Sequence, residues 1–523
     1  MPGFGSPSRR SVLLGGAGAL ALATGSAGVA RASAAQGAGL ARPLGDLFTL
    51  GVASGDPYPT SVVLWTRLAA DPVAEDGLGG MPGRRIPVQW QISKNEQFTR
   101  IVRSGEALTT PESAHSVHVE AQGLEPGTEY FYRFRTGGAV SRTGRTRTAP
   151  APGRMGELTM CFASCSHFGE GYFTAYRRMA EDQPGLILHL GDYQYEYAAK
   201  ATDVRTVLGP ETVALADYRL RHSQYKTDPD LQLAHATAPW LVVWDDHETE
   251  NNWADEIPEA SSQTPGAAFL DRRRAAFQAY YENMPLRRTS RPKGIDMQLY
   301  RRIGWGGLIN FHMLDTRQYR DDQLFGDGNK PDAPELRDPR RTITGAEQEA
   351  WLLDGLRRSG ARWDVLGQQV WFSQMDHDPG PAKILSMDSW DGYQASKDRV
   401  RDGFRHTRNT VVLTGDVHSH WANEVKADFN DPGSPSVATE LVTTSVTSGR
   451  DGADTTPGGD KLKAANSHIK FYSYRRGYVR TRIDAGQVRA DFRTLPYVSK
   501  PDAPAQTAAS FVVEDRDPTL HTP

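Results

Sequence analysis

Polar clusters follow directly after five short apolar runs in this chain, at 158–163, 186–190, 240–244, 308–314 and 410–414. Helix-like patterns separate these runs at 173–181 and 271–283, and Thr344 and Glu347 are spaced as a capping box that opens a helix to Arg358. A further apolar run lies at 363–366. Continuous apolar runs that alternate with helices are typical of buried strands in an α/β domain. We therefore expect an α/β fold from about residue 156 onward.

The clusters are rich in side chains that bind metals or phosphate. In chain order they contain Cys165, then Asp192 and Tyr195, then Asp246 and His247, then Arg317, and finally Asp416, His418 and His420. Ligands of open α/β sheets collect at the carboxyl ends of the strands. These residues are therefore expected to meet at one edge of the sheet.

The chemistry of the clusters indicates bound cations. Asp192, Asp246 and Asp416 would repel one another unless cations lay between them. Thiolate, phenolate and imidazole together suit a transition metal, whereas carboxylates suit a harder ion such as calcium. A two-metal site of this kind generates hydroxide for an in-line displacement at phosphorus, and the fork of Arg317 would bind phosphate oxygens.

Each cluster taken alone also has a structural interpretation. A Gly-Asp pair is usually a turn, a single histidine is usually structural, and Tyr195 also fits a packed core position. Asp56, which follows the stretch at 50–55, is expected to lie in a turn. Only the ordered combination of clusters favours a metal site.

The two cysteines, Cys161 and Cys165, are not expected to form a disulfide. Four residues along a strand span about 13 Å, whereas a disulfide needs Cα atoms within about 7 Å. Cys161 is interpreted as a small core residue. Cys165 lies where its apolar run ends, so its thiol is either incidental or a metal-stabilised thiolate, and the wider pattern favours the thiolate.

Residues 46–148 have a different pattern, which predicts a small antiparallel β-sandwich. Apolar or alternating runs at 61–65, 86–93, 116–121 and 129–136 are separated by turn residues. The segment from Leu124 to Tyr130, followed by Phe-Tyr-Arg-Phe, is similar to the tyrosine corner of fibronectin type III domains. The sequence Thr-Ala-Pro-Ala-Pro-Gly at 148–153 is expected to link this domain to the next.

Residues 1–34 are expected to be an export signal. Arg9 and Arg10 precede a weakly apolar stretch, and Ala30-Arg31-Ala32 fits a cleavage site. Paired arginines before such a stretch are similar to a twin-arginine signal, although Val12 and Leu14 stand where that pattern often has Phe and Lys. An ordinary secretory signal and a disordered tail are the alternatives.

Net charge and hydropathy exclude two classes of partner. The formal net charge of −3 is too balanced for a protein that binds nucleic acid by bulk charge, although nucleic acid is still a conceivable substrate. Arg272-Arg273-Arg274 and Arg340-Arg341 are expected to be solvated faces. Residues 12–30 are uncharged but mostly Ala and Gly, so no transmembrane segment is expected.

The order of the motifs resembles the PhoD-type alkaline phosphatases and phosphodiesterases, which belong to the calcineurin-like metallophosphoesterases. The motifs are Cys165, Gly-Asp-x-x-Tyr, Asp-Asp-His-Glu and Gly-Asp-Val-His. The resemblance covers nearly the whole mature chain and is strongest at 162–165, 244–252 and 314–320. It implies a four-layer fold, with two mixed β-sheets flanked by helices, after an immunoglobulin-like or fibronectin III-like sandwich.

The same resemblance implies a ligand set. Ferric iron would take Cys165, Asp192, Tyr195 and His418, with Asp192 as the bridge, and one or two calcium ions would include a site at Asp246 and Asp416. His247 would stabilise the phosphoryl group in flight or protonate the leaving group.

Two departures from the wider superfamily bear on these assignments. Ser164-Cys165 replaces the usual Asp-x-His, as in PhoD-like enzymes, and Asp416 takes the first position of the usual Gly-His-x-His. His420 is then an additional imidazole, which we expect beside the ligands, with direct ligation left open. Asn251 and Asn252 are expected to orient the Asp246 loop.

We therefore expect three parts: a twin-arginine signal at 1–34, a sandwich at 46–148 and a catalytic domain at 156–515. The expected protein is a bacterial phosphoesterase, secreted in folded form through the twin-arginine machinery, which hydrolyses phosphate monoesters, diesters or both. A close alternative is phospholipase D-like activity on lipid head groups. A secreted binding protein with a degenerate site is an alternative of another class, which the intact ligand set disfavours.

Overall fold

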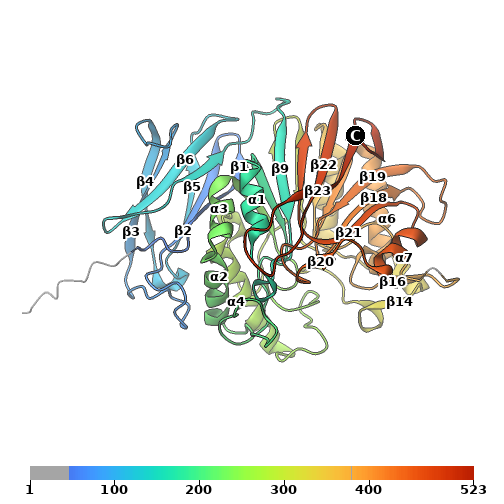
Figure 1. The fold of residues 1–523 in the computed structure, drawn as a ribbon, viewed down its shortest axis with the longest axis horizontal. Coiled ribbons are helices and arrows are strands. Elements are labelled where there is room, and N and C mark those ends of the chain that lie inside the picture. The colour runs from blue at the N-terminus through green and yellow to red at the C-terminus, as the bar shows by residue number, and fades with distance from the viewer. Residues whose placement is uncertain (1–45, 379) are drawn as a thin grey trace, which may run out of the picture. The chain divides into compact units, whose positions relative to one another are not determined.

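Two β-sheets packed face to face form the centre of the structure, a computed structural model that describes residues 46–378 and 380–523 (Figure 1). The expected signal at 1–34 lies outside the described residues. Within those residues, no helix combines the length and apolar character that a bilayer span requires.

The first sheet is built around three parallel strands. These are β9 (Leu158–Ala163), β10 (Leu186–Leu190) and β11 (Pro239–Val243). Strand β1 (Val52–Tyr58) pairs in parallel with β11, and β2 (Ser61–Arg67) and β5 (Ser116–Gln122) extend that side. On the other side, β21 (Ile469–Ile483) pairs with β9 and leads to β22 (Gln487–Leu495), β23 (Gln506–Glu514) and β24 (Asp517–His521).

The second sheet contains another parallel group. The sheet runs from β12 (Arg301–Trp305) through β13 (Ile309–Met313), β15 (Trp363–Gly367), β17 (Thr410–Thr414) and β19 (Ser436–Val442) to β18 (His420–Lys426). Strands β13, β15, β17 and β19 are parallel, whereas β12 and β18 pair antiparallel at the two ends. The first residues of β21 pair with β18, and its last residues pair with β9 in the first sheet. This one strand therefore joins the two sheets.

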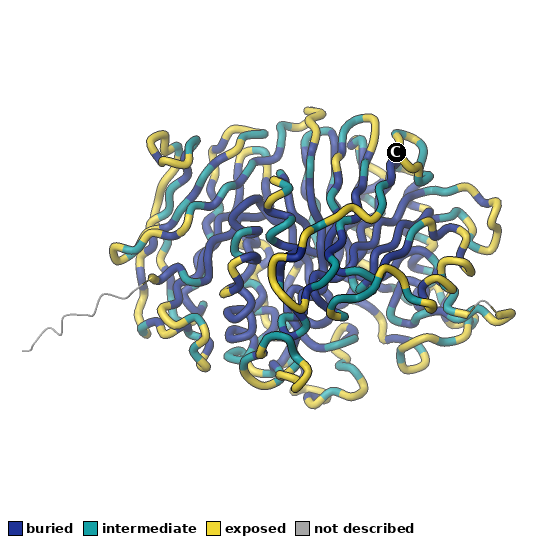
Figure 2. Tube along the Cα trace, in the orientation of Figure 1, coloured by how far each residue is buried: buried dark blue, intermediate teal, exposed yellow. Residues whose placement is uncertain are grey.

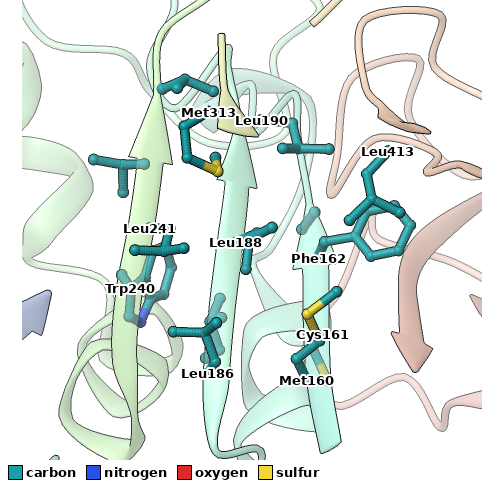
Figure 3. Close-up of a cluster of buried hydrophobic side chains, with 14 of the residues drawn as sticks. Met160, Cys161, Phe162, Leu186, Leu188, Leu190, Trp240, Leu241, Met313 and Leu413 are labelled. Atoms are coloured by element: carbon teal, nitrogen blue, oxygen red, sulfur yellow. The ribbon is translucent and has the colours of Figure 1, made fainter. Parts of the chain in front are cut away.

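Alternation along the strands explains the layering. In β17, Val411 and Leu413 face the core between the sheets, whereas Val412 belongs to the core beneath the helices. Met313 and Leu413 from the second sheet lie near Leu190 and Phe162 from the first (Figure 3). Strands covered on both faces read as continuous apolar runs, which is the pattern that the sequence carries.

Helices complete four layers. The first sheet is covered by α1 (Thr174–Glu181), α2 (Leu215–Lys226), α3 (Pro229–Thr237) and α4 (Ala267–Asn283). The second is covered by α5 (Gly345–Arg358) and α6 (Gln394–Gly403), and α7 (Pro457–Ala465) packs on β21. Most strand residues are buried, and exposed residues gather in the loops (Figure 2). The expected four-layer α/β fold is confirmed.

The N-terminal strands form a sandwich with an unexpected link. A separate sheet contains β3 (Ile86–Ser93), β4 (Ile101–Thr109), β6 (Glu129–Thr136), β7 (Ala139–Val140) and β8 (Gly144–Arg147). It packs on β2 and β5 through a shared apolar core. Strands β1, β2 and β5 form the other sheet of the sandwich. Because β1 pairs with β11, this sheet is continuous with the first sheet of the α/β domain.

Three local expectations need correction. Asp56 is not in an ordinary turn: it is buried inside β1 at a register shift and pairs with Arg301 at 2.8 Å. The helix after Thr344 exists, but Thr344 has helical backbone angles and no capping hydrogen bond, so there is no capping box. Arg272 and Arg273 are not solvated, since both are buried and ion-paired with carboxylates.

Lys226, at the end of α2, is a buried cation among uncharged partners. It is 1% exposed, its Nζ donates to the Tyr193 hydroxyl at 3.0 Å, and it lies 3.4 Å from His235 Nε2. The face of Trp65 is 4.5 Å away. Burial, with a smaller contribution from Arg67, lowers the pKa of Lys226 from 10.5 to about 7.

This burial predicts a pH-dependent stability. Between pH 7 and 10.5 the unfolded chain holds a proton on Lys226 that the folded chain has lost, so stability rises with pH through this window. Below pH 7 both states are protonated and folding must bury the charge. We expect Lys226→Met to raise the free energy of unfolding at pH 6 by about 2–4 kcal/mol and to flatten the pH profile. The free energy of unfolding in urea is measured between pH 6 and 9, and the same pH dependence in wild type and variant would contradict this prediction. Lys470→Met, at a more exposed lysine, is the control.

Candidate metal centre

The expected ligands lie on loops that leave the carboxyl ends of β9, β10, β11 and β17. Four of them have left-handed backbone, with φ of 59° at Cys165, 54° at Asp192, 62° at Asp416 and 52° at His418. Such angles cost about 1–3 kcal/mol for a residue other than glycine and concentrate at functional sites. The surrounding backbone holds them: the Cys165 amide donates to the Gly191 carbonyl at 3.1 Å.

Close contact between the two sheets brings these loops together. Between the sheets, a side chain at Gly415 would meet Ser164 Cβ at 2.8 Å, and within the first sheet one at Gly191 would meet Asp245 Cβ at 2.5 Å. Ser164 also forms a parallel bridge with Ser445, in the loop after β19. The two glycines are therefore required for the strand ends to converge.

One group of ligand atoms matches the expected iron site. Atoms of Cys165, Asp192 and His418 lie within 4.8 Å of one another. The Tyr195 hydroxyl joins them, since it donates to Asp192 Oδ2 at 2.9 Å and lies 3.1 Å from His418 Nε2. Ser448 Oγ donates to the same hydroxyl at 2.7 Å.

A second group shares Asp192 with the first. Atoms of Asp192, Asp246 and His247 lie within 4.8 Å of one another. Asp246 accepts the amide of Asn252 at 2.7 Å, which orients this carboxylate as expected for the loop. Asp416 is in neither group, but it lies near the second one: burial and the charges of Asp245, Asp388 and Asp246 raise its pKa well above the ordinary value. The expected pairing of Asp246 with Asp416 stays a prediction.

The donor atoms fit cations. Asp192 Oδ1 and Asp245 Oδ2 are buried without a hydrogen-bond partner, a condition that bound ions relieve. Burial raises the pKa of Asp192 well above its ordinary value and that of Asp245 to about 7. Burial, together with the charge of Asp192, also raises the pKa of the Cys165 thiol and the Tyr195 phenol. Ionised forms of these groups therefore require compensating positive charge.

His247 is anchored through one of its ring nitrogens, Nδ1. Its Nδ1 bonds to Glu196 Oε2 at 2.8 Å, and its ring stacks on Tyr195 at 4.1 Å. Glu196 also accepts the Asn251 amide at 2.9 Å. Burial alone would lower the pKa of His247, but the carboxylates of Glu196, Asp246 and Asp192 raise it well above its ordinary value. Nε2 is therefore the nitrogen available to a substrate.

Arg317 has partners that differ from the expected phosphate. Its Nε donates to Asp245 at 2.5 Å, and its two terminal nitrogens donate to both oxygens of Asp388 at 2.8 and 2.9 Å. Its side chain is fully buried. Because carboxylates occupy all three nitrogens, this geometry fits a residue that positions Asp245 and Asp388 better than one that binds phosphate.

Removing this guanidinium should destabilise the fold strongly. Arg317→Met leaves Asp245 and Asp388 without their shared cation, and breaking such a buried pair costs about 3–5 kcal/mol. Arg317→Lys should recover only part of this, because an ammonium cannot bridge two carboxylates as a fork does. Urea unfolding measures the loss. Arg340→Met, at an exposed ion pair with Asp338, should cost far less, and an equal loss in both variants would contradict the assignment.

His420 is a structural residue in this arrangement. Its Nδ1 accepts the Thr444 amide at 3.1 Å, and its Nε2 lies 3.3 Å from the Arg493 carbonyl. Both nitrogens are thus used by the backbone, which leaves none for a metal. Cys161 and Cys165 are both free and buried, as expected.

The residues that organise these loops were not predicted from the sequence. Glu248 accepts the amides of Asp192, Tyr193 and Asp245 at 3.2, 2.6 and 2.8 Å. Its place in Asp-Asp-His-Glu was a usable signal. Glu196 follows Tyr195 directly, whereas Asp388 and Ser448 lie in segments without any motif.

A phosphatase of known structure shares this fold. The structure of purple acid phosphatase PPD1 from yellow lupin (Lupinus luteus) seeds matches with a TM-score of 0.55 and 12% identity, over 89% of this chain and 73% of that chain. At this identity the match shows a shared fold.

Relatives closer in sequence narrow the class. Alkaline phosphatase D of Bacillus subtilis (strain 168) is 50% identical over 475 residues, which cover 89% of this chain and 81% of that protein. A structure described as that of PhoD matches with a TM-score of 0.88 and 49% identity, over 91% and 92% of the two chains. The PhoD-like phosphatase family matches residues 160–492, and the N-terminal domain of PhoD-like phosphatases matches residues 32–150. The chain belongs to the PhoD-like phosphatase family and is a phosphoric ester hydrolase.

Proposed function

We propose that this enzyme hydrolyses phosphate monoesters, diesters or both at a centre of ferric iron and calcium. The observation that carries the proposal is the sharing of Asp192 between two groups of ligand atoms, one with Cys165 and His418 and one with Asp246. Thiolate, phenolate and imidazole favour ferric iron, and the carboxylate side favours one or two calcium ions. The alkaline phosphatase name of the Bacillus subtilis relative supports the same substrate class.

Glu196, His247 and Arg317 have separate proposed roles around the cations. When bound, the cations would supply positive charge for phosphoryl oxygens and lower the pKa of a nearby water. Glu196 fixes the His247 ring through Nδ1, so that a proton at Nε2 faces the group that reacts. Arg317 holds Asp245 and Asp388 beside Asp246 and so keeps the loop after β11 in place.

Paired substrates test the proposal. Purified protein is assayed with 4-nitrophenyl phosphate, bis(4-nitrophenyl) phosphate and lecithin, each with and without calcium, and its iron and calcium contents are measured. We expect turnover of at least one chromogenic ester, and loss of turnover in Asp192→Asn, which keeps the shape of the side chain but removes the bridging charge. Asp182→Asn, at a carboxylate that pairs with Arg480, is the matched control. Protein that contains iron and calcium but turns over none of the three substrates would contradict the proposal, as would full turnover by protein that contains neither metal.

Visible absorption tests the ferric assignment through Tyr195. A phenolate on ferric iron absorbs visible light by charge transfer, so the protein should be coloured. Tyr195→Phe keeps the ring that stacks on His247 at 4.1 Å and removes only the oxygen. We expect the absorption band to shift or disappear and the iron to become easier to reduce. Tyr197→Phe, whose ring centroid lies 6.4 Å from that of Tyr195, should leave the spectrum unchanged. An unchanged spectrum in iron-loaded Tyr195→Phe would remove Tyr195 from the ligand set.

We also propose that the enzyme is exported in folded form through the twin-arginine machinery. The paired Arg9 and Arg10 and the Ala30-Arg31-Ala32 site support an N-terminal signal at 1–34. Loading of metal before export fits two free, buried cysteines in an exported protein. We retain 46–148 and 156–515 as the proposed domain boundaries.

A further inference from the structure

A cavity lined by arginines lies at the opposite end of the second sheet from the metal centre. It has a volume of about 330 Å³ and lies against Thr410, the first residue of β17. Asp416 follows the other end of the same strand, and five strand residues span about 16 Å. The cavity therefore does not belong to the metal centre.

Four arginines line this cavity: Arg401, Arg405, Arg408 and Arg516. Arg401 pairs with Asp398 at 3.1 Å and Arg408 with Asp515 at 2.5 Å, so their charges are partly offset. Within 46–378 and 380–523, Arg405 and Arg516 form no ion pair, and both are exposed. Asp402 is the one carboxylate among the residues that line the cavity. The surplus of positive charge suits an anion.

The wall that carries Arg516 is rigid. Asp515 pairs with Arg362 at 2.8 Å and with Arg408, and it accepts the Asn409 amide nitrogen at 2.8 Å. The Arg516 amide donates to Asn409 Oδ1 at 2.6 Å, and Arg516 has a left-handed φ of 68°. These contacts fix the turn between β23 and β24 against the start of β17. A site formed before its ligand arrives loses less entropy on binding.

The remaining lining is mixed: Thr407, Asn409, Thr410 and Ser436 are polar, and five residues form an apolar surface. Phe404, from the 3-10 helix Phe404–His406, is 3% exposed, and Val513, from β23, is 2% exposed. Ala427, Val437 and Pro518 complete this surface. A cavity of this size with a few charged groups around an apolar surface is typical of small-ligand sites.

We propose that this cavity is a second ligand site, which binds a phosphoryl group attached to a small apolar group. Arginine forks match the planar arrangement of phosphoryl oxygens, and the surface around Phe404 would cover the apolar part. The site is separate from catalysis and does not depend on the proposed metals.

Phenylphosphonate tests the site, because its carbon–phosphorus bond resists phosphatase cleavage. Isothermal titration of the purified enzyme at low ionic strength should detect one binding site for phenylphosphonate in addition to the site at which it competitively inhibits hydrolysis. Arg405→Glu with Arg516→Glu should weaken this site by about 10- to 100-fold, the scale of a lost charge-assisted contact, with kcat/KM and the inhibition constant unchanged. Asp402→Asn should tighten it, because the one carboxylate in the lining is neutralised.

Controls decide the assignment. Arg340→Glu, at an arginine 88% exposed and outside the cavity lining, should leave binding unchanged. A single site that is fully explained by inhibition, or a remote site that survives the double variant, would overturn the proposal. Inorganic phosphate is titrated in parallel, and equal affinity for it would overturn the assignment of an apolar part to the ligand.

Discussion

Hydrolysis should stop when calcium is removed with EGTA and return when calcium is added back. The expected calcium side consists of carboxylates, including Asp246 and the shared Asp192, whose Oδ1 has no hydrogen-bond partner among the residues that the structure describes. Carboxylate sites bind calcium reversibly. Asp416, which is expected on the calcium side, is only partly buried, so solvent reaches this side of the centre. We expect residual activity below about 1% of the starting value, on the scale of several kcal/mol of lost charge stabilisation.

The thiolate, phenolate and imidazole that we propose as iron ligands give this experiment an internal control. They favour a transition metal, which a calcium-selective chelator should leave in place. The visible band should therefore persist while activity is lost, which separates loss of calcium from loss of iron or unfolding. Full activity in dialysed protein that contains no measurable calcium would contradict the calcium assignment.

The strands beneath the site could be predicted closely because they are buried on both faces. The expected runs at 158–163, 186–190 and 410–414 coincide with β9, β10 and β17. By contrast, no strand was predicted after residue 414, yet β21, β22 and β23 occupy much of that region. β22 (Gln487–Leu495) mixes arginine and aspartate with apolar residues, so it lacks a continuous apolar run. Its pairing with β21 and β23 comes from distant segments that a local pattern does not contain.

The ligands could be predicted, but their partners could not. Cys165, Asp192 and His418 each follow a strand in a recognisable motif, and the structure brings their ligand atoms together. The role of Arg317 depends on Asp388, 71 residues further along the chain. The motif shows that an arginine follows a strand, but only the fold shows that carboxylates occupy its nitrogens. The motif therefore predicts a phosphate contact without showing that Asp245 and Asp388 compete for the same guanidinium.

Replacement of His247 by alanine should reduce kcat by about 10²- to 10⁴-fold, the range for a group that donates a proton or stabilises developing charge. Nδ1 is bonded to Glu196, so Nε2 is the nitrogen that reaches the reacting group. Glu196→Gln keeps an acceptor for Nδ1 without its charge and should cost only about 10-fold.

Metal content distinguishes two roles for His247, a group that acts on the substrate and a metal ligand. The second role arises because a ring nitrogen of His247 lies within 4.8 Å of carboxylate oxygens of Asp192 and Asp246. If His247 acts on the substrate, His247→Ala retains iron and calcium in wild-type amounts, and Glu196→Gln changes the pH profile without changing metal content. If His247 is a ligand, His247→Ala loses metal, and added calcium restores part of its activity. Steady-state kinetics and metal analysis of the same samples distinguish these results. Loss of metal in step with activity would overturn the assigned role, because Glu196 would then orient a ligand rather than a proton donor.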